Sequence, residues 1–343
     1  MKVVFDGTSH GEGYSGTVCD LPEGFYIDVE GINEELRLRK CGYGRSNRQN
    51  TEEDKVILSG LKNGFTAGDV TFCLPNRKHS AKPPFTAIRP NHADWAASVR
   101  HGTVDLRALS ERASARNSVG YVIAGAIARQ ILGQTGIEIF SRTVQVGDVV
   151  ATSDNGRCEK ELRADGSLTE EMKKRIDSAR LKGDSLGGKV RVVATGVPAG
   201  IGDFFPYSER IDGKIAGAMM SIPSVKAVEF GKGTEFAGMS GSESAEKVGW
   251  DNGVKYLTNN CGGVTGGITD GADLDITLTV KPVPTVKGVL SVDLITGQQV
   301  MQMYERADTC VVPNVGIIAE NMLATVLLGE IQRHPKYCKL IER

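Results

Sequence analysis

Hydrophobic and polar residues alternate along several short stretches of the chain, a pattern typical of β-strands that are buried on one face. The clearest stretch is residues 274–280, where four aliphatic residues alternate with Asp275, Thr277 and Thr279. Other stretches with strand-like composition are residues 2–5, 25–29, 144–151 and 189–197. The predicted strands are thus spread over most of the chain.

Two long apolar stretches, residues 114–132 and 315–332, predict helices. Both are apolar around much of the helical circumference, so we expect them inside the fold. A third predicted helix, residues 168–181, is charged, and Ser167 with Glu170 matches a capping box at its start. Strands mixed with a few buried helices favour an α+β fold over a doubly wound parallel sheet. No linker-like segment divides the chain, so residues 1–343 are predicted to form a single domain.

The charge and the cysteine content argue against several classes of protein. With 41 basic and 42 acidic residues the net charge is −1, which does not suit generic nucleic-acid binding. The longest apolar run, residues 119–128, is shorter than a membrane span, and the first residues hold no apolar core of signal-peptide length. The seven cysteines are scattered without a C-x-x-C pair, unlike a zinc site or a disulfide framework. We therefore expect a cytoplasmic protein with reduced thiols, no metal, and no nucleic-acid or membrane partner.

Glycine is the unusual component of the sequence, at 42 of 343 residues, or about 12% against a usual ~7%. Residues 11–16 match G-x-G-x-x-G, but strand-like or loop residues follow where a dinucleotide site requires a helix. Residues 183–187 match G-x-S-x-G, but a predicted helix precedes them and a strand follows, the reverse of a hydrolase nucleophile elbow. The sequence therefore favours neither a Rossmann nucleotide site nor a serine hydrolase.

Basic residues are clustered although the total charge is balanced. Three segments carry several each: Arg37, Arg39, Lys40, Arg45 and Arg48; Arg77, Lys78, Lys82 and Arg89; and Arg100, Arg107, Arg112 and Arg116. One such group alone is typical of a solvated surface, but three together can converge on a polyanionic small ligand. Gly42 and Gly44 frame the first group and would let backbone amides approach an anion closely. Among five histidines, His10 and His92 stand where a general acid or base can be held.

Several short motifs occur in the order found in one enzyme family. They include Ser9-His10-Gly11-Glu12, Gly42-x-Gly44-Arg45-x-x-Arg48, Arg89-Pro90-x-His92-Ala93-Asp94, Arg112-x-Ser114-Ala115-Arg116, Ser221-Ile222-Pro223-x-Val225-Lys226, Gly262-Gly263-x-x-Gly266-Gly267-Ile268 and Lys281-Pro282-x-Pro284-Thr285. Through these motifs the chain resembles the chorismate synthase family over essentially its whole length.

The resemblance implies a fold and a reaction. The family fold is a β-α-β sandwich, in which central helices lie between antiparallel sheets, and its members are typically homotetramers. They convert 5-enolpyruvylshikimate 3-phosphate into chorismate by a 1,4-anti elimination of phosphate. The reaction requires reduced FMN although it has no net redox change, and NADPH is a candidate reductant. Because substrate and cofactor together carry two phosphates and two carboxylates, an arginine-lined pocket is expected.

The resemblance also implies roles for individual residues. The catalytic set is His10 as the acid that assists the leaving phosphate, His92 as the residue that protonates the flavin, and Asp308 as the carboxylate that helps the flavin accept the substrate's proton. The substrate or NADP set is Arg39, Arg45, Arg48 and Arg116. The flavin set is Arg112, Ala113, Ser114, Gly266, Lys281, Pro282, Val283, Pro284, Thr285 and Arg306.

The chain departs from the family pattern after Arg107. Family members usually have three glycines and an arginine there, whereas this chain has Ala108, Leu109, Ser110 and Glu111 before Arg112. The segment around Asp308 also lacks the usual neighbours, but all the proposed acid–base residues are retained. The sequence therefore favours an active enzyme. The alternatives are a divergent FMN-binding paralogue that holds an anionic ligand without forming chorismate, and a purely structural or partner-binding module.

Overall fold

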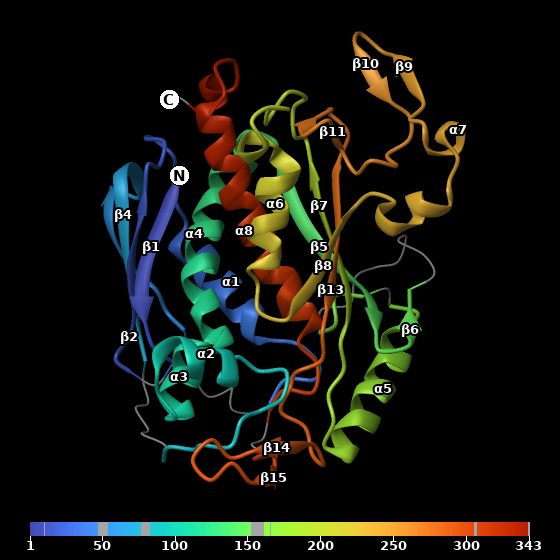
Figure 1. Cartoon of the computed structure of the whole chain (residues 1–343). Helices are drawn as coiled ribbons and strands as arrows, with labels where there is room; N and C mark the ends of the chain where they lie inside the picture. Colours follow the sequence, from blue (N-terminus) through green and yellow to red (C-terminus); the bar gives the residue numbers. More distant parts are fainter. Residues whose placement is uncertain are drawn as a thin grey trace.

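Two antiparallel β-sheets enclose a layer of helices (Figure 1). This arrangement is seen in a computed structural model that describes residues 1–9, 11–46, 54–76, 83–151, 161–164, 166–304 and 307–341. Both chain ends lie at the same end of the sandwich (Figure 1). The α+β class expected from the sequence, with central helices between antiparallel sheets, is confirmed.

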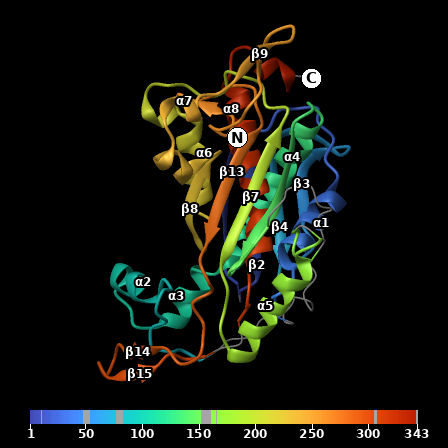
Figure 2. The same ribbon diagram turned by 90° about the vertical axis from the view of Figure 1, so that its right-hand side faces the viewer.

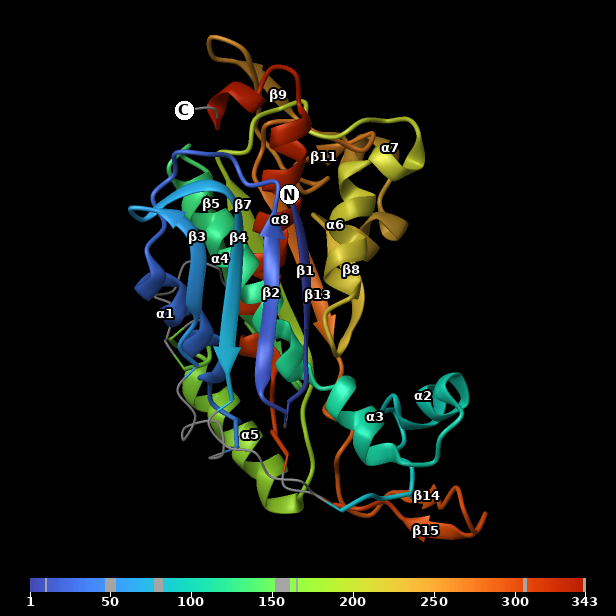
Figure 3. The ribbon, with the colours of Figure 1, turned by 90° about the vertical axis from the view of Figure 1, so that its left-hand side faces the viewer.

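The first sheet is built from the N-terminal part of the chain (Figure 3). Its strands run in the order β1-β2-β4-β3 and are antiparallel throughout. Their bounds are β1 Lys2–Gly7, β2 Gly13–Cys19, β3 Ile57–Lys62 and β4 Phe65–Pro75. Gly16, the third glycine of the G-x-G-x-x-G match, lies in β2 and not at the start of a helix, so the rejection of a dinucleotide site is confirmed.

The second sheet covers the opposite side of the helices (Figure 2). Its strand order is β6-β5-β7-β13-β8, again antiparallel. The bounds are β5 Glu138–Val146, β6 Val149–Val150, β7 Gly188–Thr195, β8 Val225–Phe230 and β13 Leu274–Val280. Strand β13 has the predicted bounds, and its aliphatic residues are buried while the polar ones between them are partly exposed.

The layer between the sheets contains α1 (Val29–Lys40), α4 (Ser118–Gly133) and α8 (Val312–Arg333). Helices α4 and α8 pack very closely, since a Cβ on Gly125 would collide with the backbone carbonyl of Asn321. Helix α8 is long and apolar enough to cross a membrane by length and composition, but 89% of its most apolar window is buried inside the fold. The two predicted apolar helices are therefore the core of the protein, as their all-round hydrophobicity indicated.

A small lobe projects below the sandwich and combines distant parts of the sequence (Figures 1 and 2). It contains α2 (Asp94–His101), α3 (Leu106–Arg112), β14 (Leu290–Val292) and β15 (Gln299–Met301). The remaining elements are α5 Thr169–Lys182, α6 Ile211–Met220, α7 Gly241–Ser244, β9 Val248–Trp250, β10 Val254–Tyr256, β11 Val264–Thr265 and β12 Ile268–Thr269. The 3-10 helices are Ala115–Asn117, Tyr207–Glu209, Gly233–Gly238 and Cys338–Leu340.

Three local predictions from the sequence differ from the structure. Residues 144–151 are not one strand, because β5 ends at Val146 and a turn separates it from β6, which begins at Val149. Residues 25–29 form no strand, because Asp28 caps α1 with its side chain and the helix begins at Val29. The N-cap position of α5 is Leu168, one residue later than the Ser167 that the capping-box pattern placed there. The G-x-S-x-G segment, in contrast, is the expected helix-to-strand turn, with Gly183 ending α5 in the left-handed conformation at φ 69°.

Candidate active site

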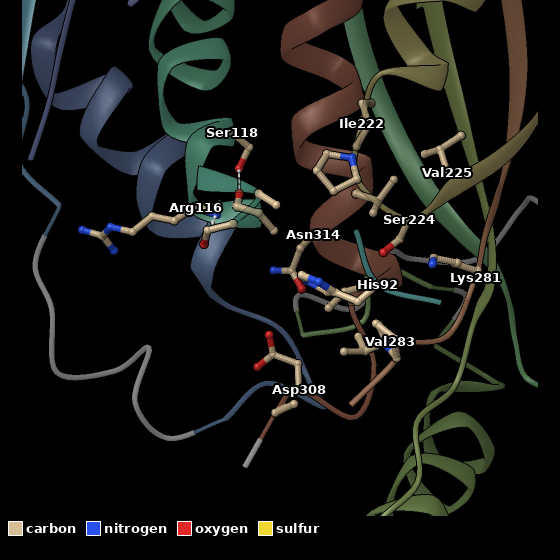
Figure 4. Close-up of a pocket in the computed structure, with 18 of the residues that line it drawn as sticks. His92, Arg116, Ser118, Ile222, Ser224, Val225, Lys281, Val283, Asp308 and Asn314 are labelled. Atoms are coloured by element: carbon tan, nitrogen blue, oxygen red, sulfur yellow. Dashed lines mark hydrogen bonds between the residues drawn. The ribbon is translucent and has the colours of Figure 1, made fainter. Parts of the chain in front are cut away.

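A cavity of about 740 Å³ lies where the central helices meet the lobe. Its walls come from the end of α1, the start of α4, the first turns of α8, the start of α2, and the segments before β8 and after β13. Its volume is typical of small-molecule sites. In Figure 4, Arg116 lies on one side, Lys281 and Ser224 lie on the other, and His92, Asn314 and Asp308 lie between them.

One wall of the cavity is cationic and is organised by a single buried carboxylate. Asp54 receives Arg39 Nη2 at 3.1 Å and Lys40 Nζ at 3.4 Å on Oδ2, and Arg116 Nη2 at 3.0 Å on Oδ1. Burial lowers the pKa of Arg39 to about 10, opposed by the charge of Asp54. Asn76 holds the same Arg116 nitrogen at 2.8 Å. Arg39 and Arg116 also line the cavity, so this network presents fixed positive charge to any ligand there.

A second ion pair, between Arg45 and Asp308, also lines the cavity. Arg45 Nη1 lies 2.7 Å from Asp308 Oδ2, and the Ser46 amide donates to Asp308 Oδ1 at 2.8 Å. Gly44 makes this contact possible: its φ is +100°, and a Cβ there would lie 2.8 Å from the Cβ of Cys310. The glycine predicted to let amides approach an anion thus brings them to a carboxylate of the protein itself.

His92 lies in the turn that leads into α2, where the sequence placed it. Its Nδ1 is 2.5 Å from Oδ1 of Asp94, a carboxylate with no solvent exposure. Burial alone would raise the pKa of Asp94, but hydrogen bonds from Arg89 and His92 outweigh it and hold the pKa far below its usual range. Asp94 is therefore an anion whenever the protein is folded near neutral pH.

The wall opposite the arginines carries lysines among apolar residues. Lys226 and Lys281 line it, and Lys281 Nζ donates to the carbonyl of Asn91 in the turn before His92. Burial, and then the neighbouring charge of Lys226, lower the pKa of Lys281. Ser185 donates to the carbonyl of Val283 at 2.6 Å and so ties the 281–285 segment to the turn before β7.

Comparisons with known proteins agree over the full length of the chain. The model of the chorismate synthase family matches residues 1–331. The chorismate synthase of Carboxydothermus hydrogenoformans is 37% identical, with 96% of this chain and 92% of that protein covered. Chorismate synthase 2 of Bacillus cereus is 35% identical, with 94% and 92% covered. The chain belongs to the chorismate synthase family.

A solved structure titled as chorismate synthase has the same fold. It superimposes with a TM-score of 0.81 at 29% identity, covering 99% of this chain and 94% of the other. The β-α-β sandwich expected from the resemblance is thereby confirmed. As a chorismate synthase, the chain is a lyase of aromatic amino acid biosynthesis.

Most of the site residues expected for a chorismate synthase line one cavity. They are Arg39, Arg45, His92, Ala113, Ser114, Arg116, Lys281, Val283, Pro284, Thr285 and Asp308. Arg112 and Pro282 adjoin lining residues in the sequence but are not lining residues themselves. Gly266 lies in the turn between β11 and β12, at the end of the molecule opposite β14 and β15 (Figure 1). His10, Arg48 and Arg306 lie outside the described residues.

Several residues that shape this cavity were assigned no role from the sequence, among them Asp54, Asp94, Lys226 and Asn314. Asp54 ends an ordinary acidic run, and nothing in its neighbours signals that it is buried among cations. Asp94 was visible only as part of a motif, next to the histidine that it binds. Their importance comes from contacts across the fold or across a turn, which composition does not record.

The altered segment after Arg107 is a helix in this chain. Asp105 caps α3 by accepting from the amides of Arg107 and Ala108, so residues that replace the family's glycines continue as a regular turn. Ser110 on this helix lies 2.5 Å from Arg89 Nη2 and lines the cavity. The altered segment therefore still reaches the cavity, through Ser110.

Proposed function

We propose that this protein forms chorismate by 1,4-anti elimination of phosphate from 5-enolpyruvylshikimate 3-phosphate, with reduced FMN bound in the same cavity. The observation that carries the proposal is the convergence of Arg39, Arg45 and Arg116 on a cavity that also holds His92 and Asp308. These residues come from separate segments of the chain, and the fold brings them together. Two buried carboxylates orient some of them: Asp54 binds Arg39, and Asp94 binds His92.

The arginines suit the anionic substrate. Guanidinium groups bind phosphate and carboxylate through paired, charge-assisted hydrogen bonds, which are among the strongest in proteins. Asp54 fixes Arg39 and Arg116 before any ligand arrives, so little ordering is required on binding. During elimination, negative charge grows on the departing phosphate oxygen, and fixed cations stabilise that charge most when it has fully developed.

The residues of the cavity also fit FMN. Asn314 is 4% exposed, and its Nδ2 donates to the carbonyls of Arg39 and Cys41, which fixes the amide. Within the described part of the chain its buried Oδ1 has no hydrogen-bond partner, which leaves an acceptor for an N–H group of a bound ring. Ile222, Val225 and Val283 supply apolar surface beside it, and Lys281 can meet a phosphate.

The acid–base roles follow from the positions of the side chains. Reduced FMN, when bound, supplies an electron-rich ring that assists the elimination without net redox change. Asp308 is held by Arg45 and the Ser46 amide at the edge of this space, where its carboxylate can take up a proton. His92 is anchored through Nδ1, so Nε2 is the atom at which it holds or transfers a proton. The role of His10 and the use of NADPH rest on the family resemblance.

Anaerobic phosphate release tests the proposal. The protein with photoreduced FMN should release phosphate and form chorismate in equal amounts, while oxidised FMN supports neither. Bound FMN without phosphate release at saturating substrate would favour the divergent paralogue. Absence of any FMN-dependent rise in melting temperature would favour the structural module.

We propose from the same resemblance that the chain is a single domain, assembles as a homotetramer and works in the cytoplasm. Large apolar side chains exposed on the single chain support assembly, including Trp95, Phe205 and Tyr207. Light scattering coupled to size-exclusion chromatography tests the tetramer directly, and a monomer at micromolar concentration would contradict it.

A further inference from the structure

His92 is held by a short contact that decides which of its nitrogens carries a proton. Nδ1 lies 2.5 Å from Asp94 Oδ1 and 3.0 Å from Arg89 Nη2. If Nδ1 were unprotonated, its lone pair would face the carboxylate oxygen at a distance where two lone pairs repel strongly. A proton on Nδ1 turns the same contact into a charge-assisted hydrogen bond. The distance to Asp94 therefore assigns the proton to Nδ1 and leaves Nε2 as the reactive atom.

Asp94 is itself unable to turn away. Its Oδ2 accepts from the Arg89 amide at 3.0 Å and from Arg89 Nε at 2.8 Å, while Oδ1 accepts from Arg89 Nη2 at 2.8 Å. It opens helix α2, where a negative charge is stabilised by the helix dipole. Each oxygen thus has two donors, and the carboxylate has no solvent exposure.

Arg89 is fixed in turn from two further sides. Its guanidinium lies over the ring of Phe85, 5.2 Å from the centroid, and its Nη2 donates to Ser110. Ser110 Oγ donates to the Leu106 carbonyl one turn earlier in α3. The helix that replaces the family's glycine segment thus ends in contact with the arginine behind His92.

We propose that Asp94, held by Arg89, is a positioning residue that keeps the catalytic His92 in the Nδ1-protonated tautomer. The inference rests on the proposed function, in which His92 moves a proton within the cavity. Asp94 touches neither reacting atoms nor the cavity itself; it acts only through the imidazole. In its absence the ring could rotate or take the Nε2-protonated form, and the atom that faces the ligands would change from acceptor to donor.

Asp94→Asn tests this idea in a directed way. The amide that replaces Asp94 must place its oxygen at one position and its NH₂ group at the other. Oδ2 faces two N–H groups of Arg89 and Oδ1 faces one, so the amide oxygen should take the Oδ2 position and the NH₂ group should face His92. A donor facing Nδ1 requires that nitrogen to be unprotonated. The variant should therefore convert neutral His92 to the Nε2-protonated tautomer.

The tautomer can be read from ¹⁵N spectra of the full-length protein labelled at its histidine rings, with the His92 signal identified by its loss in His92→Gln. Wild-type His92 should show a protonated Nδ1, and Asp94→Asn a protonated Nε2. The matched control is Asp105→Asn, the same change at the cap of α3 in the same lobe, where asparagine caps as well as aspartate. It should leave the His92 signal and turnover unchanged.

Turnover provides the second readout. Asp94→Asn should lower kcat for phosphate release by roughly 10²- to 10⁴-fold, the range expected when an acid–base group is misdirected, with KM within about twofold. A purely structural role would instead lower the amount of folded protein and leave kcat per folded site unchanged. A partial recovery of kcat in Asp94→Glu, which restores the charge, is also expected.

The outcomes separate the inference from the proposed function. If wild-type protein releases no phosphate, the proposed function fails, and the tautomer spectrum still decides the role of Asp94. If neutral wild-type His92 carries its proton on Nε2, the inference is overturned. This test uses only the wild-type protein, so it holds even if Asp94→Asn folds poorly. Turnover of Asp94→Asn at the wild-type rate, with unchanged spectra, would overturn it as well.

Discussion

Two buried clusters of charge lie beside the central helices, one around Asp54 and the other around Glu320. In both, a carboxylate that is 2% exposed at its side chain binds arginines directly. Glu320 receives Arg163 at 2.5 Å and Arg129 at 3.1 Å, and Arg129 also binds Glu35 at 2.7 Å. By local chemistry alone the two clusters are hard to tell apart.

The two clusters differ in what else their arginines contact. The arginines that bind Asp54 also line the cavity, whereas Arg129 and Arg163 are turned toward groups of the protein. Ser141 and the carbonyls of Ile139 and Ser141 complete the Glu320 cluster. A buried ion pair adds little net stability and is weak evidence of purpose by itself. A ligand site is therefore distinguished from a structural network by the cavity beside its cations, and not by the ion pair.

The largest expected difference is between the proposed acid–base residues of the cavity and the Glu320 cluster, and it lies in catalysis. His10→Ala and Asp308→Asn should each lower turnover by roughly 10²- to 10⁴-fold, the usual contribution of a general acid or base. Binding of substrate should weaken far less. Glu320→Gln should leave turnover per folded molecule near the wild-type value, because Glu320 is not among the residues that line the cavity and its charge is bound by Arg129 and Arg163. Steady-state phosphate release measures all three, and unchanged turnover in either of the first two would count against its role.

Removing the charge of Asp54 should lower the unfolding free energy in a way that an anion bound in the cavity can partly reverse. Asp54→Asn leaves Arg39 and Arg116 without the carboxylate that they share, which should cost about 3–5 kcal/mol of unfolding free energy. An anion in the cavity can replace part of that charge, so inorganic phosphate should raise the melting temperature of Asp54→Asn more than that of wild type.

Glu320→Gln is the matched control for this experiment. It should lose about as much stability as Asp54→Asn, since it also breaks a buried pair. Phosphate should not restore it, because its arginines do not face the cavity. Equal recovery of both variants in phosphate would show that the comparison between the clusters is wrong.

A third buried carboxylate, Asp94, should make the unfolding free energy depend on pH. Because the folded state lowers the pKa of Asp94, its stabilising effect is present above the unfolded pKa of about 3.9 and is lost as the pH falls toward the lower folded value. The difference in unfolding free energy between wild type and Asp94→Asn should therefore narrow below about pH 4. Urea titrations from pH 6 to pH 2.5 measure it, and a constant difference would contradict the assignment.

The smallest effect is expected on the exposed face of α1. Arg37 lies two residues before Arg39, but it is 57% exposed and pairs with Glu34 at 2.5 Å. Arg37→Ala should change the unfolding free energy by less than about 1 kcal/mol and leave the KM for substrate unchanged. Thermal denaturation and steady-state kinetics check both, and a raised KM would mean that the ligand reaches beyond the described cavity.

Arg37 and Arg39 also show how far the sequence could predict the site. The arginine-rich segment was expected to contribute to an anion-binding pocket, and Arg39 and Arg45 do line the cavity, but nothing in the sequence separates the exposed Arg37 from the buried Arg39. That difference depends on Asp54, which lies beyond the segment and meets it only in the folded chain. The long helices and β13 were predictable because a single face or the whole circumference is buried. The start of α1 was not, because one cap hydrogen bond outweighed a strand-like composition.

The contact between Gly125 and Asn321 has a consequence for the size of the cavity. Arg116 and Ser118 stand at the beginning of α4, and Asn314 stands in the first turn of α8, so opposite sides of the cavity extend from the same pair of helices. The distance between α4 and α8 is set in the middle of the helices, where Gly125 lets the two backbones come into direct contact. A methyl group added there would push the two helices apart at a point two to three turns from their ends at the cavity, and so would enlarge the cavity.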